Sequence, residues 1–174
     1  METGQDSFVI RLKEGDRQAA AELVDRYYEQ IYLFMRRLGH SRQVSEDLTQ
    51  ESFLQAWTHI GQLREGKTLN IWLYRFAGNV SRQYWRRHKG TASIDGFDVP
   101  SGGESDSDRA EHSEQLVRLK NAVAALPIKP RQAVVLHYMQ YLTIAEAAEA
   151  AGVREGTFKS RLNKALKILR RQIG

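Results

Sequence analysis

Apolar residues recur at helical spacing along most of this chain, and the alternating pattern of a β-strand does not appear. The clearest stretch, from Thr143 to Arg171, predicts two helices joined by a turn. Thr143 and Glu146 have the spacing of a capping box at the start of the first helix. Gly152 can adopt the positive φ that ends it. In the second helix the apolar positions are Phe158, Leu162, Leu166 and Leu169.

Basic side chains fill the remaining positions of this second helix. An alanine-rich helix, a glycine turn and a cationic second helix form the outline of a DNA-binding helix-turn-helix. A helical hairpin with a merely solvated basic face is the alternative. The position of the glycine and the concentration of cations favour DNA binding. The cations are Lys159, Arg161, Lys164, Lys167, Arg170 and Arg171.

The rest of the pattern predicts an all-α protein with two small helical domains, residues 1–90 and 114–174. In the first domain we expect helices from Phe8 to Lys13, from Asp16 to Gly39, from Ser45 onward and over residues 71–89. In the second we expect helices over 114–126 and from Arg131 to Tyr141, before the helix-turn-helix. Residues 91–113 are rich in glycine, serine and acidic side chains, which predicts a flexible acidic linker.

Charge is distributed unevenly among these segments. The 174-residue chain has a net charge of +5. Residues 1–90 carry 14 basic and 11 acidic side chains, residues 91–113 carry one and six, and residues 114–174 carry 11 and four. Two basic domains around an acidic linker suit a polyanionic partner that is contacted at two places.

The helix over residues 71–89 interleaves aromatic and basic side chains, as single-stranded nucleic acid binding requires. Its large aromatics, Trp72 above all, are better explained as core residues. The arginines and Asn79 are therefore the candidates for nucleic-acid contact. In the preceding helix, Asp47, Gln50 and Glu51 share a polar face, which by itself indicates a solvated surface.

Catalytic and metal-binding patterns are missing from the sequence. There is no cysteine, no HExxH spacing among the five histidines, and neither a phosphate-binding glycine loop nor a G-x-S-x-G. We therefore expect no enzyme activity, no metal and no cofactor. Neither a signal peptide nor eighteen consecutive apolar residues occur, which predicts a cytoplasmic protein that does not insert into membranes.

Sequence motifs in both predicted domains, in the same order along the chain, resemble the ECF (extracytoplasmic function, group 4) members of the sigma-70 family of bacterial RNA polymerase sigma factors. DLTQESFLQAW, from Asp47, resembles region 2.2 of that family, and WLYRFAGNVSRQYWRR, from Trp72, resembles regions 2.3 and 2.4. LPIKPRQAVVLHYMQYLTIAEAAEAAGVREGTFKSRLNKAL, from Leu126, resembles region 4. The match covers nearly all of the chain except the linker.

This resemblance implies a sigma factor that brings core RNA polymerase to promoters and helps to open the DNA. The region 2.2 helix would dock on the β′ clamp helices, and region 4 would hold the β flap. Regions 2.3 and 2.4, with the loop from Gly61 to Asn70, would recognise and melt the −10 element, and region 4 would bind the −35 duplex. An anti-sigma factor is a further implied partner. The implied polymerase-binding residues are Asp47, Gln50, Glu51 and Phe53. The implied −10 residues are Arg75, Asn79, Arg82, Arg86 and Arg87. The implied −35 residues are Arg154, Glu155, Thr157, Lys159, Ser160 and Arg161.

Three departures from the family pattern affect promoter recognition. Gln83 stands where an aspartate is common, and Arg154 stands where a small residue usually caps the recognition helix. The usual EIA of the first helix is AEA here. Two other protein classes remain as alternatives: a stand-alone helix-turn-helix regulator, and an adaptor that binds polymerase but not DNA.

Overall fold

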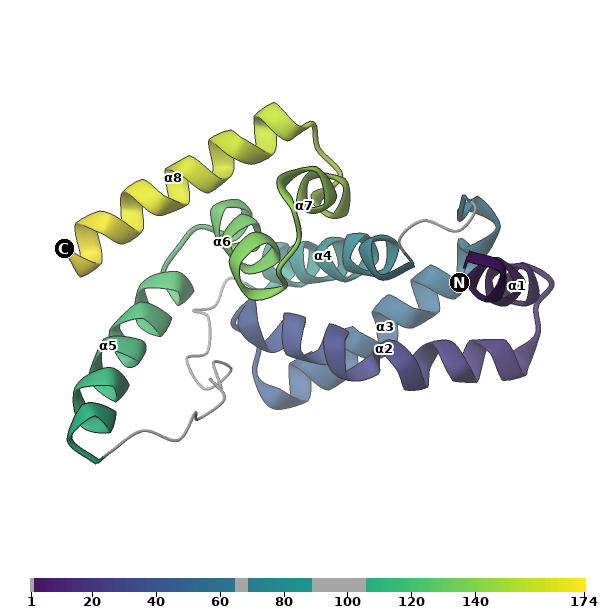
Figure 1. The fold of residues 1–174 in the computed structure, drawn as a ribbon, viewed down its shortest axis with the longest axis horizontal. Helices are drawn as coiled ribbons and strands as arrows, with labels where there is room; N and C mark the ends of the chain where they lie inside the picture. The colour runs from purple at the N-terminus through teal and green to yellow at the C-terminus, as the bar shows by residue number, and fades with distance from the viewer. Residues whose placement is uncertain (1, 65–68, 89–105) are drawn as a thin grey trace.

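The computed structural model describes residues 2–64, 69–88 and 106–174, and within these ranges every regular element is helical (Figure 1). The N-terminal unit contains α1 (Glu2–Lys13), α2 (Arg17–Arg37), α3 (Arg42–Thr58), the 3₁₀ turn η1 (Ile60–Gln62) and α4 (Leu69–Arg87). The C-terminal unit contains α5 (Asp106–Ala124), α6 (Ile128–Val134), the π-helix η3 (Val135–Met139), α7 (Ile144–Ala151) and α8 (Glu155–Ile173). The all-α prediction is confirmed.

Several helices begin earlier than the sequence pattern predicted. Helix α1 begins at Glu2 instead of Phe8, and α4 begins at Leu69, two residues early. Helix α3 begins at Arg42 instead of Ser45, because the Ser41 side chain caps it by accepting a hydrogen bond from the Val44 amide. Helix α5 begins at Asp106, inside the segment predicted as linker. The sequence contains neither glycine nor proline between Gly103 and Pro127, so no helix-breaking residue delays that start. The remainder of the predicted linker, residues 91–105, lies outside the described residues.

The helix-turn-helix forms as its local pattern predicted. Thr143 Oγ1 accepts a hydrogen bond from the Glu146 amide, and the Glu146 carboxylate accepts one from the Thr143 amide, which completes the capping box. Gly152 ends α7 with φ 69°. Before this motif, the helix expected from Arg131 starts at Ile128, so that Pro130 lies in its first turn, where proline is tolerated.

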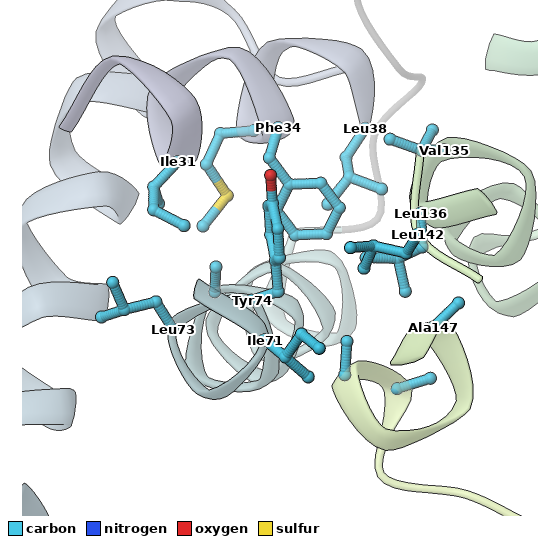
Figure 2. Close-up of a cluster of buried hydrophobic side chains, with 14 of the residues drawn as sticks. Ile31, Phe34, Leu38, Ile71, Leu73, Tyr74, Val135, Leu136, Leu142 and Ala147 are labelled. Carbon is cyan, nitrogen blue, oxygen red and sulfur yellow. The ribbon is translucent and has the colours of Figure 1, made fainter. Parts of the chain in front are cut away.

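The apolar core continues from one unit into the other (Figure 2). Helix α4 lies between the α2–α3 pair and the α6–α7 pair (Figure 1). Buried side chains of α2 and α4 meet apolar residues from η3, the following loop and α7. Those labelled in Figure 2 are Ile31, Phe34, Leu38, Ile71, Leu73, Tyr74, Val135, Leu136, Leu142 and Ala147. The two units therefore pack as one body in this structure.

A buried arginine crosses the seam, by which we mean the contact between the N-terminal and C-terminal units. Arg131, on α6 of the C-terminal unit, is 8% exposed. Its Nη1 donates to the Leu38 carbonyl at 2.9 Å and its Nη2 to the Leu126 carbonyl at 2.7 Å. Its guanidinium carbon lies 5.6 Å from the centre of the Trp85 ring. One side chain thus joins the end of α2, α4 and the loop before α6.

His40 is buried beside this arginine. Its Nε2 lies 2.7 Å from Ser81 Oγ, and its ring stacks on Trp85 at 4.7 Å. Burial, and secondarily the positive charge of Arg131, lower the pKa of His40 from 6.5 to about 3. The imidazole is therefore neutral near pH 7.

Replacing Tyr141 by glycine should stabilise the protein. Tyr141 has φ 58° and is 87% exposed, so it adopts a left-handed backbone while its ring packs against little. Glycine relieves that strain but also adds conformational entropy to the unfolded chain. The net effect should raise the free energy of unfolding by about 0.5–1 kcal/mol. Urea denaturation measures the change. Tyr138→Ala is the control, because Tyr138 is exposed on helical backbone; an equal gain there would rule out strain as the cause.

Acid should destabilise the fold through His40. The pKa of His40 is lowered on folding, so the unfolded chain binds more protons and stability falls as the pH drops from 6.5 toward about 3. We expect a loss on the order of 3 kcal/mol between pH 7 and pH 4. The measurement is urea denaturation between pH 7 and pH 4, comparing wild type with His40→Gln. Parallel pH profiles for the two proteins would contradict the assignment.

Candidate nucleic-acid interface

Helix α8 presents most of the predicted −35 residues to solvent. Glu155 begins the helix, and Gly152 and Val153 form the turn that leads into it. Phe158 and Leu162 are buried and orient the helix, which leaves its opposite face free. The exposed predicted residues are Arg154, Glu155, Thr157, Lys159 and Ser160. Arg161 differs from them, because it is half-buried and faces the N-terminal unit.

Arg154 occupies the N-cap position of α8. It has extended backbone (φ −69°, ψ 153°), and its side chain makes no capping hydrogen bond. A serine, threonine or aspartate there would stabilise the helix by about 1 kcal/mol. Arg154 does not cap the helix in this way and is instead an exposed cation at the N-terminal end of α8.

Helix α4 carries the predicted −10 residues on more than one face. Arg75, Arg86 and Arg87 are exposed, whereas Asn79 and Arg82 are half-buried. Arg87 lies apart from Arg82, because it lines a small cavity of about 160 Å³ against α3. The predicted set is therefore only partly brought together.

Arg82 is held by the C-terminal unit. Its Nη1 donates to Gln132 Oε1 at 2.6 Å, and its Nη2 donates to Asn79 Oδ1. Burial, followed by the charges of Arg161 and Arg86, lowers the pKa of Arg82. The structure thus brings cations of α4 and α8 together. The contact of Arg82 with Gln132 was not predicted, because no local sequence pattern connects residues 50 positions apart.

Arg75 lies at the turn of the helix-turn-helix. A Cβ atom built on Gly152 would be 3.5 Å from Arg75 Nε. The α4 face and the turn before α8 are therefore neighbours. In this arrangement Arg75 lies beside the turn that leads into α8, and Arg82 lies near Arg161 of α8.

Helix α3 exposes Asp47, Gln50 and Glu51, as predicted for the polymerase-binding face. Phe53 does not share that exposure. It is 7% exposed and belongs to the core, because it points from α3 toward α2. Phe53, named with these three by the resemblance, is therefore not part of the exposed face.

An apolar groove of about 490 Å³ lies between α2 and α3 beside this face. Sequence reasoning missed it, although Leu54, 67% exposed on α3, is an apolar residue in a polar position that could have signalled it. Gln50 and Phe53 both reach the groove. Its lining residues are Arg17, Ala20, Leu23, Val24, Tyr28, Gln50, Phe53, Leu54 and Trp57.

Neither a metal-binding cluster nor a membrane-spanning helix occurs in the described part of the chain. No three His, Cys, Asp or Glu residues there lie together so as to hold a metal ion. Of the helices described, none is long and apolar enough to cross a bilayer.

Comparison with known proteins matches both units to one family. Residues 23–91 match the model for sigma-70 region 2, and residues 116–169 match the model for sigma-70 region 4. The chain is 30% identical to the ECF RNA polymerase sigma factor SigW of Bacillus subtilis, over 95% of this chain and 94% of that protein. It is 31% identical to SigM of Mycobacterium tuberculosis, over 92% of this chain and 80% of that protein.

Solved structures share the fold. CnrH, in complex with the cytosolic domain of CnrY, superposes with a TM-score of 0.69 at 20% identity, covering 96% of this chain and 95% of that one. The sigma factor RpoE from Bartonella quintana, in complex with the anti-sigma factor NepR, superposes with a TM-score of 0.63 at 23% identity, covering 88% and 95%. The two region matches, together with the 30% identity to SigW over nearly the full length of both proteins, show that the chain belongs to the ECF sigma factors of the sigma-70 family.

Proposed function

We propose that this sigma factor divides promoter recognition between its two units: residues 1–90 bind core polymerase and the −10 element, and residues 114–174 bind the −35 element. The observation that carries the proposal is the pair of basic helix faces on α4 and α8 in one chain, beside the acidic and apolar surface of α3. Cations on two helices neutralise phosphates at two places, and α3 is free to bind protein.

In the −35 element, α8 enters the major groove with its N-terminal end first. Arg154 and Lys159, both exposed, pair with guanine or with phosphate, and Glu155 accepts from cytosine. Thr157 and Ser160 anchor the phosphate backbone. Arg161 is half-buried here, so it can contact the DNA only when its surroundings on the N-terminal unit change.

In the −10 element, α4 binds the non-template strand. Asn79 supplies both an amide donor and an acceptor for a base edge, and Arg82 and Arg86 clamp phosphates. Extraction of a base costs a few kcal/mol, which the pocket must return through contacts with the flipped base. The loop proposed to complete this pocket includes residues 65–68, which lie outside the described residues.

For core polymerase, the β′ clamp helices dock on the α3 face. Asp47, Gln50 and Glu51 provide its polar rim, and the neighbouring groove provides apolar contact through Leu54. Phe53 contributes by supporting the groove from beneath, since it is buried.

The chain works as a transcription initiation factor without catalytic chemistry or a cofactor, and it acts in the cytoplasm, where its polymerase is. We propose that the chain also binds an anti-sigma factor, because the similar RpoE structure is a complex with the anti-sigma factor NepR. Binding energy alone separates the strands.

Run-off transcription on a library of random promoters tests this function. Core polymerase with the wild-type protein should select transcripts that share paired −35 and −10 elements. Lys159→Ala should weaken binding to the selected −35 duplex about 5- to 30-fold and reduce the slope of log affinity against log salt by about one.

Lys13→Ala is the matched control for that variant, because Lys13 is an exposed cation on α1, remote from α8 (Figure 1). Its affinity and salt slope should remain those of wild type. Duplex binding without any stimulation of core polymerase would favour a stand-alone regulator, and stimulation without a shared −35 element would refute the role given to α8.

Leu54→Glu should weaken binding to core polymerase. Leu54 is 67% exposed at the groove, so a charge there is tolerated by the fold but conflicts with an apolar partner. We expect at least about a tenfold loss of affinity, as for a central interface residue. Fluorescence anisotropy of labelled sigma factor titrated with core polymerase provides the measurement.

Val117→Glu is the control, because Val117 is an exposed apolar residue on α5, 48% exposed and distant from the groove in sequence. Equal losses for both variants would show that the effect is not specific to the α3 face. Thermal unfolding of both variants confirms that neither loses its fold.

A further inference from the structure

A line of exposed residues runs along α8, opposite the side through which the helix packs. These residues follow one another at intervals of three or four, which places them on one face of the helix. We call them the outward line, and they are Gly156, Ser160, Lys164, Lys167 and Arg171. The other side of α8 is held in the core by Phe158, Leu162, Ala165 and Leu169. A partner that binds the free face of α8 therefore meets the outward line.

Side-chain size increases along the outward line. Gly156, in the first turn of α8, has no side chain, and Ser160, about one turn further on, has a short one. The long cations Lys164 and Lys167 come next, and both line a shallow hollow of about 580 Å³ on the surface of the helix. The N-terminal end of the outward line is therefore the part where the α8 backbone is least covered by side chains.

The fold itself does not require glycine at position 156. Its backbone is helical, unlike that of Gly152, which has φ 69°. A Cβ atom built on Gly156 would have no described atom within 4 Å, whereas one built on Gly78 would lie 2.4 Å from Gln132 Nε2. Glycine in a helix is also less favourable than alanine. Gly156 therefore weakens α8 without relieving a backbone or packing constraint among the described residues.

The width of the DNA major groove supplies a reason for this glycine. The groove is about 12 Å wide, and an α-helix with its side chains is about 10–12 Å across, so the helix enters with little clearance. Helix α8 has 19 residues and is about 28 Å long, and a recognition helix enters the groove with its N-terminal residues. Gly156 lies on the free face of that end, where a side chain would limit the depth of entry.

The contacts proposed for the neighbours of Gly156 depend on that depth. Arg154, Glu155 and Lys159 are exposed on either side of it. A hydrogen bond to a base edge forms only at about 2.7–3.2 Å, so these side chains must come close to the floor of the groove. Phosphates lie along the edges of the groove and are reached from a shallower position. A helix that entered less deeply would keep phosphate contacts and lose base contacts.

We propose that Gly156 is a positioning residue for −35 recognition: because it has no side chain, the first turn of α8 lies deep enough in the major groove for Arg154 and Lys159 to reach base edges. The inference rests on the proposed role of α8 in binding the −35 element. Ser160 permits the same close approach about one turn later, and Lys164 and Lys167 remain near the phosphates. Gly156 thus contributes to sequence specificity through its neighbours.

Gly156→Ala and Gly156→Leu add side chains of increasing size at this point. Both new residues favour a helix more than glycine does, so both variants should fold, and the urea midpoint of Gly156→Ala should rise. The matched controls are Gly4→Ala and Gly4→Leu. Gly4 is an exposed glycine in the first turn of α1, and a Cβ atom built on it would also have no described atom within 4 Å. Helix α1 lies far from α8 (Figure 1).

Binding is measured by fluorescence anisotropy with the full chain assembled on core polymerase. One labelled duplex carries the −35 element selected by run-off transcription, and the other carries the same bases in scrambled order. Gly156→Ala should weaken binding to the selected duplex at least about tenfold, the loss of about one base contact, and Gly156→Leu should weaken it further. Binding to the scrambled duplex should not change, because it depends on phosphate contacts. The Gly4 variants should keep the wild-type ratio of the two affinities.

Two kinds of failure can be told apart. If Gly156→Ala keeps the wild-type ratio while Lys159→Ala weakens binding to the selected duplex, the role given to Gly156 is overturned and the role of α8 remains. Equal losses on both duplexes, or an equal loss in Gly4→Ala, would also overturn it, because the effect would then not depend on base contacts by α8. If wild type does not prefer the selected duplex to the scrambled one, the proposed −35 role of α8 fails, and the role of Gly156 fails with it.

Discussion

The contact between the two units depends on the burial of Tyr74, in the N-terminal part of α4. Its ring is 1% exposed and contacts Phe34 of α2 edge to face, with centroids 5.1 Å apart. Its hydroxyl accepts from Gln30 Nε2 at 2.6 Å and donates to Gln140 Oε1 at 2.7 Å. Burial raises the pKa of Tyr74 to about 12, so it stays a neutral donor. One phenol therefore joins α2, α4 and the C-terminal unit.

The position of α4 between its neighbours explains why this helix both contributes to the core and carries exposed arginines. Apolar side chains on two sides of α4 pack into a shared core, and the remaining surface carries the arginines. A helix used in this way cannot bind nucleic acid along its whole length while both neighbours stay in place. At the seam, Arg131 Nε and Gln140 Nε2 are buried without a hydrogen-bond partner in the protein. Each such group costs about 1–3 kcal/mol, so the contact between the units is weaker than its apolar area alone would suggest.

The functional surfaces were foreseen to different degrees. Helical spacing placed Lys159 away from the buried Phe158 and Leu162, whereas the resemblance to region 4 named both Lys159 and Glu155 as recognition residues. The resemblance named Phe53 with Gln50 and Glu51, but it did not reveal that Phe53 is buried beside the groove between α2 and α3. Gln132 was not considered, because an amide between an arginine and an alanine has no local signature. Its role depends on Arg82, which comes from another part of the chain.

Four features could be predicted without the structure: the helices, the capping box at Thr143, the left-handed turn at Gly152 and the family. Each depends on residues close together along the chain or on motifs in order. Only the tertiary structure decided that the two units share a core, that Arg131 and His40 are buried between them, and that Arg82 is engaged by Gln132. Those features arise from side chains distant in sequence, whose contacts are fixed by how helices pack, and helical periodicity shows which face is apolar but not which partner covers it.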